Sequence, residues 1–139
     1  MFDFTGQQVF GYNSFDRRFL LHCYCICKQG KDSVLAYIYT DFPLLEIRLT
    51  DYRVTEQPTP DSFKGAHAMS FDRGNVIFYS SYKDKDSFFW WNRKDKVKRF
   101  GHFPAAPLRG LSAGKFLTHD ANSFTIVDAM EMMRQEHLQ

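Results

Sequence analysis

The sequence predicts a mainly β domain, in which antiparallel meanders form a small sandwich or an open barrel and a single helix lies at the C-terminus. Aromatic residues make up 17% of the 139 residues, including 15 Phe and 7 Tyr. Such side chains suit a pleated, half-buried surface, so this composition favours sheets over a helical bundle. Residues 66–103 add a second observation, because apolar runs and short polar turns alternate there in the order strand, turn, strand, turn, strand.

The first half of the chain reads as a series of strands separated by turns. Gln29-Gly30-Lys31-Asp32 has the composition of a tight turn. Farther along, Leu45, Ile47 and Leu49 alternate with polar residues, which indicates a strand with one face in water. We expect a short strand at residues 8–12 and longer antiparallel strands at 19–28, 33–40 and 44–54.

Residues 57–62 form the clearest break in the chain, since two prolines remove backbone donors and bias the preceding residues toward extended geometry. We interpret this segment as a connection inside one domain that spans residues 1–139.

After this connection, Asp72-Arg73-Gly74-Asn75 predicts a tight turn in which the glycine takes a positive φ. Near the C-terminus, Asp128 and Glu131 have the spacing of a helix N-cap and its partner. The remaining expected elements are strands at 115–118 and 123–127 and a helix at 128–138.

Residues 66–103 also resemble one blade of a β-propeller. The Asp72-Arg73-Gly74-Asn75 turn precedes an aromatic-rich strand, and a further aromatic strand follows. The resemblance is to a general blade pattern rather than to a family, and it implies an alternative fold of partial β-propeller-like blades. A closed propeller has at least four blades, or roughly 160 residues, so this chain would then be a fragment or would assemble with others.

Composition and charge bear on several classes of function. The formal net charge of +2 is too small to argue for a polyanionic partner from the whole chain. The N-terminus lacks the basic and apolar regions of a signal peptide, and no apolar run approaches the roughly 18 residues that span a bilayer. The 3 cysteines are an odd number at a spacing unlike a disulfide framework, which favours a reducing compartment. We therefore expect an intracellular, cytoplasmic protein without membrane insertion.

Cys23, Cys25 and Cys27 are the first candidates for chemistry. Alternation along a strand would put all three on one face, at a spacing that suits neither a disulfide nor the turn that wraps a zinc ion. We predict that they pack in the core, with metal binding and redox chemistry as alternatives. No pattern in the sequence predicts a catalytic residue, a metal ligand or a cofactor. The histidines expected at strand edges or in loops are His67, His102 and His119.

The segment 83–99 combines cations with the aromatic run Ser87-Phe88-Phe89-Trp90-Trp91. In a strand, successive rings face opposite sides, so one pair can enter the core while the other is covered or exposed. Exposed rings flanked by cations would suit a protein interface, or single-stranded nucleic acid through base stacking and phosphate contacts. The simpler alternative is a sheet covered on both faces, with a solvated turn. The candidate binding residues are Phe89, Trp91, Arg93, Lys94, Lys96, Lys98 and Arg99.

The sequence therefore favours a non-enzymatic protein-interaction or assembly module, such as a subunit of a larger complex or a homo-oligomer. Met130, Met132 and Met133 would add a partner surface on the C-terminal helix, although a helix docked on its own sheet explains them as well. The first alternative is a single-stranded nucleic-acid-binding domain that uses residues 83–99. The second alternative is a small enzyme with Cys/His chemistry.

Overall fold

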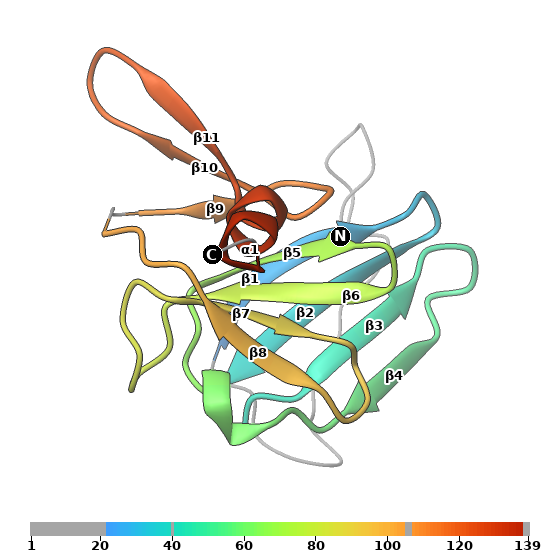
Figure 1. Ribbon diagram of the computed structural model, residues 1–139. Helices are drawn as coiled ribbons and strands as arrows, with labels where there is room; N and C mark the ends of the chain where they lie inside the picture. Colours follow the sequence, from blue (N-terminus) through green and yellow to red (C-terminus); the bar gives the residue numbers. More distant parts are fainter. Residues whose placement is uncertain (1–21, 40, 105–106, 138–139) are drawn as a thin grey trace.

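The computed structural model describes residues 22–39, 41–104 and 107–137, which form eleven strands in three antiparallel sheets and one C-terminal helix (Figure 1). The predicted mainly β fold with a terminal helix is confirmed, and the described residues form no closed barrel. The strand expected at 8–12 lies outside the described residues, as does the start of the strand expected at 19–28.

Each sheet is a meander of neighbouring strands. The first sheet contains β1 (His22–Gln29), β2 (Ser33–Tyr39), β3 (Leu44–Arg48) and β4 (Val54–Gln57), in that order. The second sheet contains β5 (Ala68–Asp72), β6 (Asn75–Tyr79), β7 (Phe88–Trp91) and β8 (Val97–Phe100), in that order. The third sheet contains β9 (Arg109–Gly110), β10 (Lys115–His119) and β11 (Phe124–Asp128), with β10 in the middle. A 3₁₀ turn, η1 (Asp61–Phe63), connects the first two sheets, and the helix α1 (Ala129–His137) follows β11.

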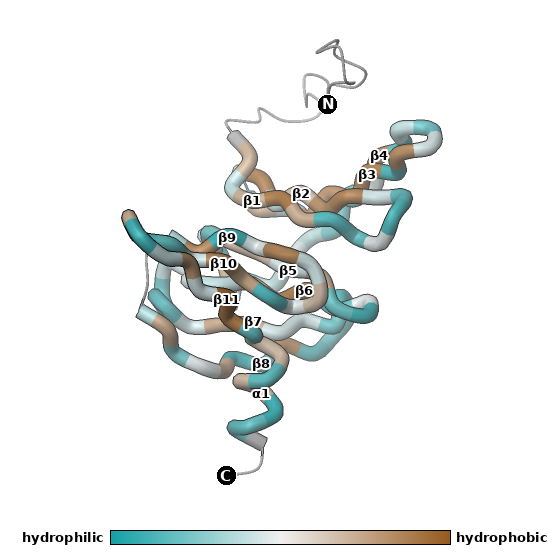
Figure 2. Tube along the Cα trace, turned by 90° about the horizontal axis from the view of Figure 1, so that it is seen from above, coloured by the Kyte–Doolittle hydropathy of each residue, from teal (hydrophilic) through white to brown (hydrophobic). Residues whose placement is uncertain are grey.

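The second sheet lies between the other two sheets, and both of its faces are covered. Its side chains alternate, so neighbours along one strand point to opposite sides. One face packs against the first sheet, and the opposite face packs against the third sheet and α1. Figure 2 shows the first sheet on one side of the molecule and α1 on the other. The buried residues that face the first sheet are Met69, Val76, Phe78, Phe89 and Trp91, and those on the opposite face are Ala68, Ile77, Tyr79, Phe88 and Phe100.

The core between the first and second sheets is built around Phe63, the last residue of η1. Its ring is fully buried and stacks on Phe78, with ring centroids 4.2 Å apart and planes at 12°. Its backbone carbonyl accepts a hydrogen bond from the buried Tyr37 hydroxyl at 3.2 Å. The proline-rich break predicted at 57–62 therefore leads into a residue that fills the space between the two sheets.

The first strand of each sheet lies next to the first strands of the others. β5 contacts both β1 and β9. Phe71 and Ser112 form an isolated parallel bridge beside β9, and the Ser70 hydroxyl donates a hydrogen bond to the carbonyl of Leu111. The three sheets therefore converge at β1, β5 and β9.

The strand expected at 44–54 is two strands, β3 and β4, joined by a turn. Tyr52 has a positive φ of 58°, and the Asp51 carboxylate accepts a hydrogen bond from the Arg53 backbone N–H at 3.1 Å. Two further strands were not predicted. β8 was missed because its charged residues Lys98 and Arg99 are typical of a solvated turn. β9 was missed because it is only 2 residues long.

The C-terminal helix agrees with its sequence signature. The Asp128 carboxylate accepts a hydrogen bond from the Glu131 backbone N–H at 3.1 Å, as an N-cap does. Met130, Met132 and Met133 pack against the core between α1 and the second sheet. The methionines therefore belong to a helix docked on its own sheet, the simpler of the two alternatives.

Gly110 allows β9 to lie against β5, and its replacement by alanine should loosen the third sheet. A Cβ at this position would lie 1.7 Å from the backbone oxygen of Met69, which cannot move without distorting β5. We expect Gly110→Ala to lower the free energy of unfolding by about 3 kcal/mol, measured by chemical denaturation. Gly30→Ala is the control, because its Cβ meets no atom within 4 Å and only the positive φ of 62° costs about 1 kcal/mol. Equal losses in the two variants would contradict this account.

Candidate binding groove where the three sheets meet

Two of the residues predicted to bind a partner, Phe89 and Trp91, are in the core between the first and second sheets. Their side chains are 2% and 1% exposed. The indole N–H of Trp91 has no acceptor among the described residues. Neither ring is accessible to a partner while the sheets are packed, so any contact through them would require the first two sheets to separate.

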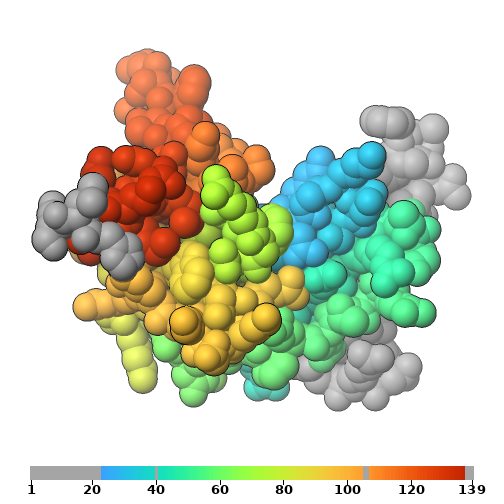
Figure 3. Space-filling view, turned by 45° about the vertical axis from the view of Figure 1, so that its right-hand side comes forward, coloured from blue at the N-terminus to red at the C-terminus, as the bar shows by residue number. Residues whose placement is uncertain are grey.

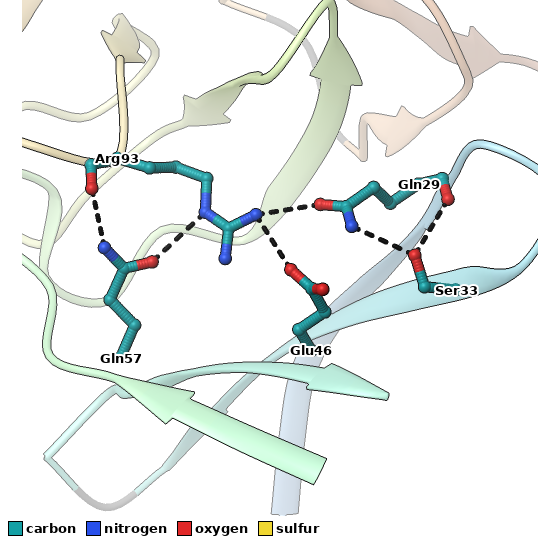
Figure 4. A network of polar contacts seen from close by, with 5 residues as sticks. All are labelled: Gln29, Ser33, Glu46, Gln57 and Arg93. Atoms are coloured by element: carbon teal, nitrogen blue, oxygen red, sulfur yellow. Dashed lines mark hydrogen bonds and ion pairs between the residues drawn. The ribbon is translucent and has the colours of Figure 1, made fainter. Parts of the chain in front are cut away.

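Arg93, a third predicted binding residue, crosses from the second sheet to the first (Figure 4). It lies in the turn between β7 and β8, where its φ is 65°. Its guanidinium donates hydrogen bonds to Gln29 at 2.8 Å and to Gln57 at 3.1 Å, and it pairs with the Glu46 carboxylate at 3.0 Å. The Gln57 side chain in turn donates to the Arg93 carbonyl at 2.6 Å. These contacts join the β7–β8 turn to β1, β3 and β4.

This network predicts that Arg93 stabilises the fold rather than a complex. We expect Arg93→Ala to lower the free energy of unfolding by about 1 to 2 kcal/mol, because half-buried polar partners lose their hydrogen bonds. Arg99→Ala is the matched control, since its ion pair with Asp84 at 2.9 Å is exposed and should contribute less than about 1 kcal/mol. Both losses of unfolding free energy would be measured by urea denaturation. A larger loss for Arg99→Ala than for Arg93→Ala would refute this assignment.

The other predicted cations lie around β8. Lys94 and Lys96 are exposed in the β7–β8 turn, where the Asn92 side chain accepts a hydrogen bond from each of their backbone N–H groups. Lys98 is half-buried on β8, and Arg99 is paired with Asp84. The rings of Phe89 and Trp91 are buried and are not exposed beside these cations.

A different site is formed where the first strands of the three sheets meet. A groove of about 470 Å³ lies there, open to solvent. Figure 3 shows the surface hollowed between the blue segment that includes β1 and the orange segment that includes β9. The side chain of Ile26 is 58% exposed in this groove. The lining residues are Tyr24, Cys25 and Ile26 of β1, His67 and Ala68 at the start of β5, and Pro107, Leu108, Arg109 and Gly110 at β9.

Tyr24 enters the groove because β1 contains a β-bulge. Cys23 pairs with Ile38 and Cys25 pairs with the adjacent Tyr37, so Tyr24 is an extra residue in the ladder. The bulge breaks the strict alternation that predicted one shared face for the three cysteines. Instead Cys23 is exposed, Cys25 is half-buried and Cys27 is buried.

The Tyr24 ring is nearly parallel to two other rings. The centroid of the His67 ring is 6.1 Å away, and the two planes lie at 9°. Tyr39 is also nearly parallel, at 6.1 Å and 14°. The Tyr24 hydroxyl forms a hydrogen bond with the Tyr82 hydroxyl. The bulge, the ring contacts and this hydrogen bond therefore fix the orientation of Tyr24 at the groove.

The electrostatics of the groove keep its acidic groups protonated. The hydrogen bond with Tyr82, together with desolvation, raises the pKa of Tyr24 to about 12. Burial raises the pKa of the Cys25 thiol well above its usual range, and the neighbouring thiols add to this. Near neutral pH both groups are neutral, and Arg109 carries the only fixed charge among the described lining residues.

The cysteines do not have the environment of activated nucleophiles. Burial raises the pKa of Cys27 to about 12, and it also raises the pKa of Cys23, against weaker lowering by backbone hydrogen bonds at Cys25 and Tyr37. A reactive thiol instead has a lowered pKa, since the thiolate is the nucleophile. Within the described residues, no group of three or more His, Cys, Asp or Glu side chains is arranged to hold a metal ion.

The reactivity of the three thiols should follow their exposure, which is greatest for Cys23 and least for Cys27. We expect DTNB at about pH 8 to modify only Cys23 of the three thiols in the folded protein. The reaction should be slower than that of a free thiol, because the pKa of Cys23 is raised. Cys25 and Cys27 should react only after unfolding in guanidinium. Cys23→Ser is the control and should remove the native reaction. Rapid modification of folded Cys23→Ser would reveal a second accessible thiol and favour the enzymatic alternative.

Reasoning from sequence alone missed most of this groove. His67 and Cys25 were singled out as residue types, but nothing connected them to Ile26 or Arg109. The exposure of Ile26 depends on the face of β1, which the bulge shifts. Arg109 belongs to a strand too short to be recognised by periodicity. Only the convergence of strands far apart in the chain brings these residues together.

The chain matches no known family model, and comparisons with curated proteins and with solved structures also give no match. In residues 22–39, 41–104 and 107–137, no helix is long and apolar enough to cross a membrane.

Proposed function

We propose that this chain is a non-enzymatic protein-interaction module that binds a segment of a partner protein in the groove between β1, β5 and β9. The observation that carries this proposal is the side chain of Ile26, 58% exposed beside the parallel rings of Tyr24 and His67. Apolar and aromatic side chains beside an arginine are typical of the energetically dominant part of protein interfaces.

The size and shape of the groove support this proposal. Its volume of about 470 Å³ falls within the range of roughly 300 to 1,000 Å³ that is common for binding pockets. It is an open cleft beside β1 rather than an enclosed cavity, which suits side chains presented by another polypeptide. Tyr24 is held by Tyr82 and the flanking rings, so little conformational entropy is lost at this side chain on binding.

The two alternative functions receive less support. An enzyme with Cys/His chemistry needs an activated nucleophile, whereas the pKa of the Cys25 thiol is raised by burial. A single-stranded nucleic-acid-binding domain needs exposed rings for base stacking, whereas Phe89 and Trp91 are 2% and 1% exposed. The cations of 83–99 would then act without the aromatic partners on which this hypothesis relied.

Selection from a display library of random peptides of about 12 residues tests the proposal directly. The folded chain should enrich a family of related peptides, and Ile26→Ser should weaken their binding by about tenfold or more, because an apolar anchor is lost. Affinities of the synthetic peptides would be measured by isothermal titration calorimetry.

Phe124→Ser is the matched control, since this side chain is 70% exposed on β11 and does not line the groove. It should leave the affinity of the selected peptides unchanged. The proposal fails if no peptide family is enriched, or if every enriched peptide binds Ile26→Ser as well as it binds the original chain.

A further inference from the structure

Arg109 has no acidic partner among the described residues. Its side chain is exposed in the groove, and no ion pair or hydrogen bond joins it to a carboxylate among the described residues. By contrast, two exposed arginines elsewhere are paired with acids: Arg99 lies 2.9 Å from Asp84, and Arg48 lies 3.3 Å from Asp51. Since the described lining residues include no Asp or Glu, none of them neutralises the positive charge of Arg109 in the groove.

The groove is also lined by an outer strand of the first sheet. Among the described residues, β1 is the first strand of that sheet and its ladder partner is β2. Tyr24 to Ile26 line the groove, so the backbone of this outer strand borders the space in which Ile26 is exposed. An extended peptide can add to such an edge through backbone hydrogen bonds, while its alternate side chains enter neighbouring pockets.

We propose that the groove binds an extended partner segment that carries an acidic side chain paired with Arg109 and an apolar side chain packed on Ile26. This inference rests on the proposed function and adds the chemistry of the partner. The carboxylate accepts hydrogen bonds from the guanidinium, in the bidentate geometry that arginine favours. The apolar side chain lies against Ile26 and the Tyr24 ring.

A polynucleotide fits this site less well than an acidic peptide. Nucleic acids are held by several cations that contact successive phosphates, and the lining residues supply one fixed positive charge. The lining also includes the apolar residues Ile26, Ala68, Pro107 and Leu108. One cation with apolar neighbours matches one carboxylate flanked by apolar residues.

The same peptide library provides the test, now with charge variants of Arg109. Peptides selected on the original chain should share an Asp or Glu next to an apolar residue. Arg109→Gln should weaken their binding by about tenfold. Replacing the shared acidic residue of the peptide by its amide should weaken binding by a similar factor. Combining the two changes should cause little further loss, because both remove the same ion pair. A new selection on Arg109→Glu should lose the acidic preference and favour Lys or Arg at the same place.

Arg73→Gln is the matched control, because Arg73 is exposed in the β5–β6 turn and does not line the groove. It should leave binding unchanged, and circular dichroism melts should be alike for all variants. Selected peptides that depend on Ile26 but lack a shared acid, or that ignore Arg109→Gln, would overturn this inference and leave the interaction module standing. Peptides that ignore both Ile26→Ser and Arg109→Gln would remove both proposals.

Discussion

The close approach of β9 to β5 is the constraint on which the groove depends. At Gly110 the two backbones are so near that an added Cβ would lie 1.7 Å from the carbonyl oxygen of Met69. The contact continues through the Ser70 hydroxyl, which donates to the Leu111 carbonyl, and through the parallel bridge of Phe71 and Ser112. Because β9 is anchored in this way, Arg109 lies across from β1, and the third sheet closes one side of the groove.

The opposite side of the groove is positioned by different forces. The first sheet is held against the second by an aromatic core around Phe63 and, at its border, by the hydrogen bonds of Arg93. Apolar burial supplies most of the stabilisation there, whereas the Arg93 network fixes how the two sheets are aligned. β1 is therefore set at a defined place beside β5, and the bulge at Tyr24 directs an aromatic ring into the space that remains.

The elements with strong local signals could be predicted from the sequence, and those set by distant contacts could not. The turn before Asn75 and the N-cap at Asp128 depend on neighbouring residues, and both are where the sequence indicated. The run of rings in β7 was ambiguous, because alternation says which rings share a face but not whether a second layer covers that face. Both faces are covered, so Phe89 and Trp91 are core residues. The groove had no local signal at all, since it exists only where three separate strands converge.

We propose above all that the junction of β1, β5 and β9 is a binding surface for an extended acidic segment. Amide chemical-shift mapping by NMR tests it most directly, with the ¹⁵N-labelled chain titrated by a peptide selected from the library. The account predicts that the largest shifts fall on Tyr24 to Ile26, Ala68 and Arg109, the backbone around the groove. Shifts confined to the β10–β11 hairpin near Phe124, or to the basic turn at Lys94, would contradict it and move the binding surface elsewhere on the molecule.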